Sequence, residues 1–353
     1  MSHRAGRKDT YWPVLTPNDP RLKSSSRSYQ NPGIDEPQNF TEPLCSPLNS
    51  TKDYLQLELP ESVTAVPSYA ELLQEWKEQE HLKRLWISYN VFQVPCSWHE
   101  SQDGVTPQMP FIHNVNGNCF RAAVSDGAMK SYQAADYATI LTRIFAEHGE
   151  RVFHEVRLLL AAGEWELVQE DKIKYAFPDA PEQRNVEMRY LKHCSAEATL
   201  NGVEFDLVSM TYKDSSVGDT VFFEVQRFCD AEMNESQAVI LSQNPSMTAA
   251  DFAGCPKRLS TKTMSGHYID EHDISTRSGA LTLEHHYLIC SAALARFLLQ
   301  EDADFPQGEK LACLLSFSNE DEFRAFCLEQ KIYGRMEDDD ITFVKIWISK
   351  DAE

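Results

Sequence analysis

Residues 116–124 read Asn-Gly-Asn-Cys-Phe-Arg-Ala-Ala-Val, a turn signal followed directly by a cysteine and an apolar run. Gly117 between two asparagines predicts a tight turn, because glycine adopts positive φ without cost and asparagine tolerates it. The residues after the turn predict the start of a helix, with Cys119 at its N-terminus. The helix macrodipole and the free backbone N–H groups would favour the thiolate there. We therefore predict a reactive thiol; the alternative is a small apolar cysteine packed beneath a loop.

The same stretch resembles the nucleophile motif of the ovarian-tumour (OTU) family of cysteine proteases. That motif runs Asp-Gly-Asn-Cys, then two hydrophobic or aromatic residues, then Arg and Ala. The sequence matches it in register at Gly117, Asn118, Cys119, Phe120 and Ala123, and departs from it at Asn116, Arg121 and Ala122. The resemblance implies that Cys119 is a catalytic nucleophile in a cysteine-protease-like fold.

The resemblance also implies a histidine general base after the strands of the sheet, with an acidic or amide residue close behind it. Gly266-His267-Tyr268 resembles that element and lies in the expected chain order. Ile269 occupies the usual position of the acid, so the residue that orients the imidazole stays open between Asp270, Asp273 and Asn116. The implied catalytic set is Cys119, His267, Asp270 and Asn116.

An OTU-like enzyme would cleave ubiquitin or a ubiquitin-like conjugate, with Cys119 attacking the isopeptide carbonyl and His267 transferring the proton. Backbone N–H groups of residues 116–119 would stabilise the oxyanion. The resemblance implies no metal or other cofactor, and it makes ubiquitin the expected partner. Two other hypotheses stay open: a non-catalytic adaptor protein with a disordered docking tail, and another cysteine-dependent acyl transferase or deamidase.

Composition narrows the class of protein. The chain of 353 residues has a formal net charge of −21, which argues against nucleic acid as a partner, because phosphate binding needs basic surface. No apolar run approaches the roughly 20 residues of a membrane-spanning helix. Nine cysteines without a CxxC pair indicate reduced thiols and an intracellular, cytoplasmic protein. A basic, serine-rich N-terminus also occurs on bacterial effectors that are delivered to a host cell.

Residues 1–66 are predicted to be a disordered tail, because they are rich in Pro, Ser, Asn and Thr and lack apolar periodicity. Residues 67–353 are predicted to form a single globular domain, with a sub-boundary considered near residue 300. Ser68 and Glu71 form a capping box, which predicts a helix that starts there and ends before Pro95.

Apolar periodicity predicts helices first and most strands later. The expected helices are 134–146, 152–162 (ended by Gly163), 185–198, 281–299 and 320–330, and the expected strands are 203–212, 220–228, 238–243, 311–317 and 341–348. The acidic run Glu337–Asp340 is interpreted as a solvated loop. Helices that precede a mostly consecutive sheet indicate an α+β class, with α/β as the alternative.

Overall fold

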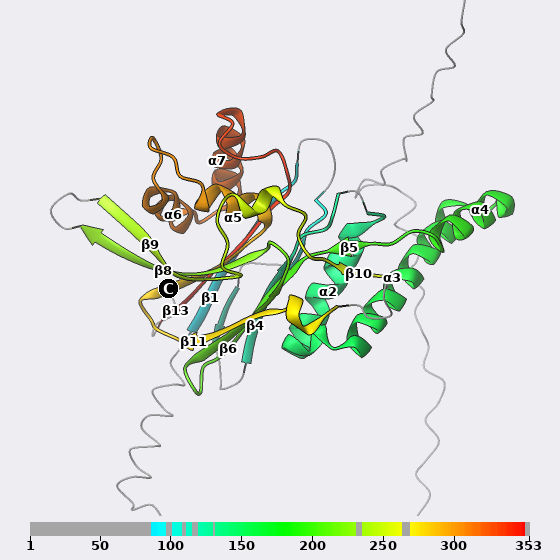
Figure 1. Ribbon diagram of the computed structural model, residues 1–353, viewed down its shortest axis with the longest axis horizontal. Coiled ribbons are helices and arrows are strands. Elements are labelled where there is room, and N and C mark those ends of the chain that lie inside the picture. The colour runs from blue at the N-terminus through cyan, green and yellow to red at the C-terminus, as the bar shows by residue number, and fades with distance from the viewer. Residues whose placement is uncertain are drawn as a thin grey trace, which may run out of the picture. The chain divides into compact units, whose positions relative to one another are not determined.

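A computed structural model describes residues 86–96, 101–107, 111–114, 119–129, 131–230, 235–262 and 269–349. All of them belong to the second of the two units into which the chain divides, Val66–Glu353. Figure 1 shows two large sheets lying between two groups of helices. The predicted tail at 1–66 lies outside the described residues and stays a prediction. The helix predicted from Ser68 to before Pro95 lies outside them only up to residue 85; its last part is wrong, because Trp86–Val94 form a strand that pairs on both sides with other strands.

The first sheet has six strands in the order β3-β1-β13-β12-β8-β9. Its strand β13, Ile341–Ser349, lies between β1, Trp86–Val94, and β12, His285–Cys290, and both pairings are antiparallel. The remaining strands are β3 (Phe111–Asn114), β8 (Val221–Asp230) and β9 (Glu235–Asn244). Strands from both ends of the described chain therefore lie side by side.

The second sheet has five strands in the order β11-β7-β6-β4-β2. They are β11 (Ser275–Ala280), β7 (Thr211–Val217), β6 (Leu200–Asp206), β4 (Cys119–Ser125) and β2 (Gly104–Thr106). A short antiparallel ladder pairs β10, Leu259–Ser260, with β5, Glu197–Ala198. Gly127 forms an isolated bridge to Ala198, which joins this ladder to the end of β4.

Helices cover the outer face of each sheet, so the described chain forms four layers (Figure 1). The helices on the second sheet are α2 (Ala134–His148), η2 (Gly149–Phe153), α3 (Glu155–Ala176) and, packed against α3, α4 (Pro181–Leu191). Those on the first sheet are α5 (Ala292–Leu299), α6 (Gln307–Ser316) and α7 (Glu320–Ile332). Two short 3-10 turns, η3 (Asp251–Ala253) and η4 (Glu271–Asp273), lie in the loops.

One apolar core lies between each sheet and its helices, and a third apolar core fills the space between the two sheets. Aromatic rings from both sheets meet there: the ring centroids of Phe205 and Tyr287 are 5.2 Å apart, and those of Tyr212 and Phe222 are also 5.2 Å apart. Strand β12 is buried on both faces, because one face meets the other sheet and the opposite face meets helices. Its residues Tyr287–Cys290 therefore read as a continuous apolar run, without the alternation of a half-exposed strand.

Several predicted elements are confirmed. The predicted helices at 134–146 and 320–330 correspond to α2 and α7, and the last predicted strand corresponds to β13. The α+β class is confirmed as well, and the strand pairings in both large sheets are antiparallel. The predicted order of elements is wrong, because β1 to β4 come before α2 in the chain.

Cys119 does not begin a helix, and this prediction is wrong. It opens β4, which pairs with β6 on one side and with β2 on the other. Alternate residues of β4 serve both cores: Ala123 faces α2, whereas Ala122 and Val124 face the first sheet. Burial on two faces thus outweighs the local helix signal.

The predicted helix at 281–299 is a strand followed by a short helix. In β12, Leu288 belongs to the core under α5–α7, and the adjacent Ile289 belongs to the core between the sheets. The predicted strand at 311–317 lies mostly in α6, whose buried Leu311, Leu314 and Leu315 follow helical spacing. Both errors come from short apolar runs, whose periodicity does not separate a buried strand from a buried helix.

The helices after α2 also differ in extent from the prediction. Gly163 does not end a helix, since α3 continues past it to Ala176. The helix predicted at 185–198 is α4, which has Pro181 at its first position and ends at Leu191. The end of the predicted helix, Glu197–Ala198, is the short strand β5 instead.

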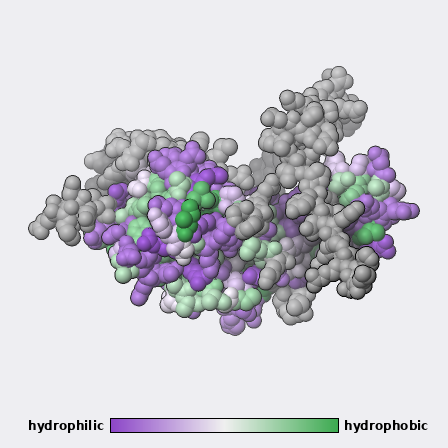
Figure 2. Space-filling model, turned by 90° about the horizontal axis from the view of Figure 1, so that it is seen from above, coloured by the Kyte–Doolittle hydropathy of each residue, from purple (hydrophilic) through white to green (hydrophobic). Residues whose placement is uncertain are grey.

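The surface seen from above in Figure 2 is mixed, with small hydrophobic patches separated by hydrophilic residues. On α7, for example, Leu328 and Ile332 are exposed. Scattered apolar residues of this kind are normal on a protein surface. Within the described ranges, none of the helices is both long enough and apolar enough to cross a membrane.

Candidate functional site

A cluster of aspartates lies where the two sheets meet at one end. We define the aspartate cluster as Asp103, Asp126, Asp219, Asp339 and Asp340. Each belongs to a loop beside the end of a strand. The cluster therefore draws on segments spread over more than two hundred residues of the chain.

The strand registers explain why these loops converge. In the second sheet, Gly104 pairs with Ser125, so Asp103 and Asp126 flank one end of that ladder. In the first sheet, Cys290 pairs with Val221 on one side and with Phe343 on the other. The loops before β8 and before β13 therefore end together, and they carry the other three aspartates of the cluster.

Asp103 is the most unusual member of the cluster. The residue is 7% exposed, and neither carboxyl oxygen makes a hydrogen bond of good geometry within the described residues, although the side chains of Thr342 and Asp126 lie close enough to lower its pKa. Burial raises the pKa of Asp103, and the negative charges of Asp340 and Asp339 raise it further. A buried carboxyl without a partner is costly unless it is neutral or bound to a positive charge.

Asp126 lies directly after β4 and faces the start of α5. The Ala292 N–H donates a hydrogen bond of 3.4 Å to its Oδ2. Burial raises the pKa of Asp126 well above its usual value, and the charges of Asp103, Asp219 and Asp339 add to that effect. Ionisation of Asp103 therefore disfavours ionisation of Asp126.

Asp340 is not part of a solvated loop, so the interpretation of Glu337–Asp340 needs correction. Asp340 is 3% exposed, and its oxygens accept hydrogen bonds from the Cys96 N–H at 2.8 Å and the Gln102 N–H at 2.7 Å. Asp340 therefore holds the backbone on both sides of residues 97–100, at Cys96 and at Gln102. Through Gln102 it also holds the backbone next to Asp103.

Asp219 lies in the turn between β7 and β8. Burial raises its pKa, Asp339 raises it further, and the positive charge of Arg258 lowers it. Gly218 before it has φ +98°, a conformation that favours glycine. A Cβ at Gly218 would lie 2.8 Å from the Lys257 carbonyl oxygen, so the turn packs closely against residue 257.

These carboxylates suit a hard divalent cation such as Mg²⁺ or Mn²⁺, which prefers oxygen ligands. Over the described part of the chain, no three Asp, Glu, His or Cys side chains are arranged so that they would together hold one ion. Mg²⁺ does not need such a cage, because it commonly uses one or two carboxylates and fills its shell with water and substrate phosphate. The unpartnered oxygens of Asp103 fit that mode of binding.

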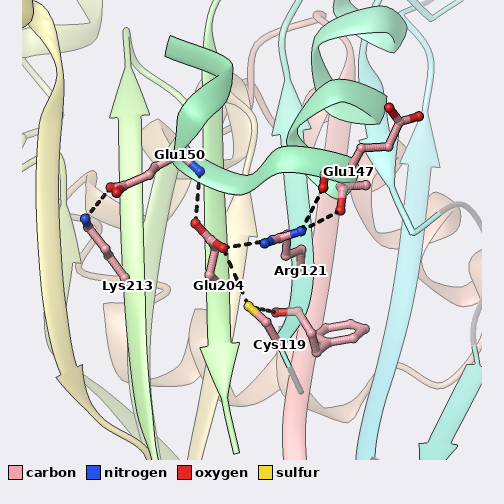
Figure 3. A network of polar contacts seen from close by, with 8 residues as sticks. Cys119, Arg121, Glu147, Glu150, Glu204 and Lys213 are labelled. Atoms are coloured by element: carbon pink, nitrogen blue, oxygen red, sulfur yellow. Dashed lines mark hydrogen bonds and ion pairs between the residues drawn. The ribbon is translucent and has the colours of Figure 1, made fainter. Parts of the chain in front are cut away.

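The region around Cys119 lies in the second sheet and has a different chemistry (Figure 3). Cys119 Sγ lies 3.6 Å from a carboxyl oxygen of Glu204, which also accepts a hydrogen bond of 2.8 Å from Arg121 Nε. The other Glu204 oxygen accepts from the Glu150 N–H at 2.9 Å. Arg121 Nη1 donates to the carbonyls of Ala146 and Glu147, so the network fastens the end of α2 to the sheet.

This network does not activate the thiol. Burial raises the pKa of Cys119 to about 11, and the negative charge of Glu204 adds to the rise, while Arg121 opposes it. A nucleophilic cysteine needs the opposite shift. The expectation of a thiolate at a helix N-terminus is therefore wrong.

The other predicted site residues are only partly described. Asn116 and His267 lie outside the described residues, so the pairing of Cys119 with His267 stays an untested prediction. Asp270 caps the short turn η4, where its Oδ1 accepts a hydrogen bond of 3.0 Å from the His272 N–H. Asp273 pairs with Lys257 at 3.3 Å.

Sequence analysis missed the members of the aspartate cluster. Gln102-Asp103-Gly104 and Ser125-Asp126-Gly127 both place an acid and a glycine at the end of a strand, a signal that was available. Such a pattern also occurs in ordinary turns, which favour Asp and Gly. What the sequence does not show is that strands distant in the chain bring these turns together.

No protein-family model matches this sequence, and no curated protein matches it either. Solved structures do show similarity. The photosystem II phosphatase PBCP is 12% identical, with 75% of this chain and 99% of that chain covered and a TM-score of 0.44. The phosphatase domain of SpoIIE from Bacillus subtilis is 12% identical, with coverage of 77% and 96% and a TM-score of 0.36. The Mycobacterium tuberculosis serine/threonine phosphatase PstP/Ppp is 14% identical, with coverage of 74% and 98% and a TM-score of 0.39.

These findings correct the OTU assignment. The solved structures just named are phosphatases and not cysteine proteases, and Cys119 lies in a strand with a raised pKa. The thiol-protease and deubiquitinase activity, and ubiquitin as the partner, are therefore wrong. The adaptor and deamidase hypotheses do not fit the findings better.

Proposed function

We propose that the chain is a divalent-metal-dependent phosphoester hydrolase whose reaction takes place at the aspartate cluster. The observation that carries the proposal is the buried carboxyl of Asp103, which makes no hydrogen bond of good geometry within the described residues and lies beside the second buried carboxyl, Asp126. The solved phosphatases are too distant, at TM-scores of 0.36 to 0.44, to add weight. The proposal therefore rests on the carboxylates.

The residues of the cluster would divide the work between them. Asp103 and Asp126 would hold the ion, with water and substrate phosphate completing its shell. Asp340 keeps the backbone of Gln102 in place, and the Ala292 N–H orients Asp126. A bound Mg²⁺ or Mn²⁺ polarises a phosphoryl oxygen and lowers the pKa of a bound water. The raised carboxyl pKa values favour this role, because a cation replaces the protons that the buried aspartates would otherwise keep.

Two measurements on the full chain test the proposal. Isothermal titration with Mn²⁺ should show binding to the wild type, and Asp103→Asn should weaken it by at least about tenfold, because a charged ligand is lost. Hydrolysis of p-nitrophenyl phosphate should require Mn²⁺ or Mg²⁺ and should be lost in the same variant.

Asp171→Asn is the matched control, since Asp171 is an exposed aspartate of α3 that pairs only on the surface with Lys174. It should behave like the wild type in both measurements. A wild type that binds neither Mn²⁺ nor Mg²⁺, or an Asp103→Asn variant with unchanged affinity, would overturn the proposal.

A further inference from the structure

Arg258 lies on the short ladder that leads away from Asp126. Gly127 bridges to Ala198, and Ala198 pairs with Leu259, so three chain segments run side by side. The Thr199 N–H donates a hydrogen bond of 2.9 Å to the Asp126 carbonyl, which extends the pairing of Gly127 with Ala198 by one residue. The row next to the bridge is therefore Asp126, Thr199 and Arg258.

Residues in one row of a sheet direct their side chains to the same face, and neighbouring strands are about 4.8 Å apart. Arg258 therefore starts on the same face as Asp126, about 10 Å from it across two strand spacings. Leu259 next to it is fully buried, which holds the backbone of Arg258 in place. The position of this arginine is thus set by the same ladder that positions the aspartate.

A second contact brings Arg258 close to the cluster from the side of Asp219. The turn at Gly218 packs against the carbonyl of Lys257. Asp219 follows Gly218 and Arg258 follows Lys257, so the two residues belong to segments that lie against each other. The effect of Arg258 on the pKa of Asp219 agrees with this placement. A positive charge therefore lies near Asp219, at the edge of a site that is otherwise rich in negative charge.

Arg258 also reaches solvent. Its side chain is 32% exposed and makes one long ion pair, at 3.5 Å, with Glu197. It lines an open groove of about 1760 Å³, whose walls also carry Lys257 and Lys262 and several carboxylates, Glu197 and Asp273 among them, while the aspartate cluster lies outside this lining. The fork of donors on its guanidinium is therefore held in place by the fold and is still accessible to a ligand that enters from the groove.

We propose that Arg258 binds the phosphoryl group of the substrate and orients it toward the aspartate cluster. This inference rests on the proposed function, since it names the residue that recognises the anion at that same site. A guanidinium matches two phosphoryl oxygens with parallel N–H donors, which a lysine does not. It would also offset the repulsion between the phosphate and the carboxylates, and Glu197 would hold the arginine ready while the substrate is absent.

Three variants of the full chain test this role. Arg258→Met removes the charge and keeps most of the length, Arg258→Lys keeps the charge and loses the fork, and Arg324→Met is a surface control from α7. Arg324 pairs only with Glu320 one helical turn away. The measurements are Mn²⁺ affinity, the KM and kcat for p-nitrophenyl phosphate, and the inhibition constant of inorganic phosphate.

Arg258→Met should raise KM and the phosphate inhibition constant about 10- to 100-fold, because a charge-assisted pair is lost. Arg258→Lys should lie between this variant and the wild type, and Arg324→Met should match the wild type. Mn²⁺ affinity should stay the same or increase in Arg258→Met, since a positive charge leaves the site. A merely structural role for Arg258 would weaken Mn²⁺ binding as well, and would count against the inference.

The result separates this inference from the proposed function. If the wild type hydrolyses p-nitrophenyl phosphate and Arg258→Met keeps the wild-type KM and inhibition constant, the role of Arg258 is wrong and the proposed function stands. If the wild type shows no hydrolysis, titration with inorganic phosphate decides. Phosphate binding that Arg258→Met abolishes supports the anion site, whereas a wild type that does not bind phosphate overturns it.

Discussion

At the scale of single residues, Asp103 gives the aspartate cluster a defined pH dependence. Its pKa in the folded protein is raised above that of the unfolded chain, mainly by burial. The folded state therefore binds more protons than the unfolded state between the two values. The stabilising contribution of Asp103 is complete below about pH 4, the usual Asp pKa, and is lost as the pH rises through the raised value.

We therefore predict that, in the presence of EDTA, the melting temperature falls as the pH is raised from about 5 to 8, and that Asp103→Asn reduces this fall. Excess Mn²⁺ should raise the melting temperature more at pH 8 than at pH 5, because protons compete with the cation for the carboxylates. Differential scanning calorimetry across this range provides the measurement. An equal Mn²⁺ effect at both pH values would contradict the coupling.

Cys119 yields a second prediction at this scale. Glu204→Gln should lower the pKa of Cys119, because the negative charge beside Sγ is removed while Arg121 stays. Alkylation of Cys119 by iodoacetamide at about pH 8 should then be faster than in the wild type, since the thiolate is the reactive form. Mass spectrometry of the labelled peptide gives the rate, and Cys119→Ala should leave the hydrolysis of p-nitrophenyl phosphate unchanged. Slower or equal alkylation in Glu204→Gln would show that the carboxylate does not control the thiol.

Some single residues of the site could be predicted from the sequence, and others could not. It singled out Cys119 as a reactive thiol, which is wrong, because burial raises its pKa and Glu204, which belongs to β6 and lies 85 positions further along the chain, adds to the rise. The turn residues Asp103 and Asp126 are visible in the sequence, yet their raised pKa values depend on burial between two sheets. Burial of that kind follows from tertiary structure and has no local sequence signal.

At the scale of elements, two buried lysines take the place of helix-capping residues. Lys310 Nζ donates to the carbonyls of Phe297 and Gln300 at the end of α5, and Lys345 Nζ donates to those of Leu315 and Phe317 at the end of α6. The last carbonyls of a helix have no partners within it. A cation there also interacts favourably with the helix macrodipole.

We predict that Lys345→Met lowers the free energy of unfolding by roughly 1–3 kcal/mol, because buried carbonyls at the end of α6 lose their donor. Lys172→Met is the matched control: Lys172 is 54% exposed and pairs with Asp136, so its loss should cost less than about 1 kcal/mol. Urea denaturation of both variants measures the difference. Equal costs would mean that the Lys345 contacts contribute no more than a surface ion pair.

The errors in element assignment follow from the same burial. Long helices with one polar face, α2 and α7, were predictable because their apolar residues recur at helical spacing. β4 and β12 are covered on both faces, so the alternation that marks a strand is missing from their sequences. Only the pairing of β4 with β6, and of β12 with β8 and β13, makes these segments strands.

At the scale of the whole molecule, the aspartate cluster depends on both sheets at once. Asp103 and Asp126 adjoin strands of the second sheet, whereas Asp219 precedes a strand of the first, and the Ala292 N–H and Asp340 connect the two sides. A bound cation would therefore stabilise the packing of one sheet on the other. The stabilisation grows with the ratio of free cation to its dissociation constant, because only the folded chain presents the site.

The last prediction concerns the part of the chain that this architecture requires. Proline-rich composition and missing periodicity predict that residues 1–66 do not contribute to the core. A protein that starts at Pro67 should therefore melt within about 2 °C of the full chain and bind Mn²⁺ with the same affinity. A shorter protein that starts at Val91 is the control, because it loses the first half of β1, whose residues pair with β13 from Ser349 to Lys345. That control should unfold or melt far lower. Strand β13, which begins directly after Asp340, would lose about half of its pairing with β1. If the protein that starts at Pro67 also melts far below the full chain, the tail is part of the folded unit and the predicted boundary at 66 is wrong.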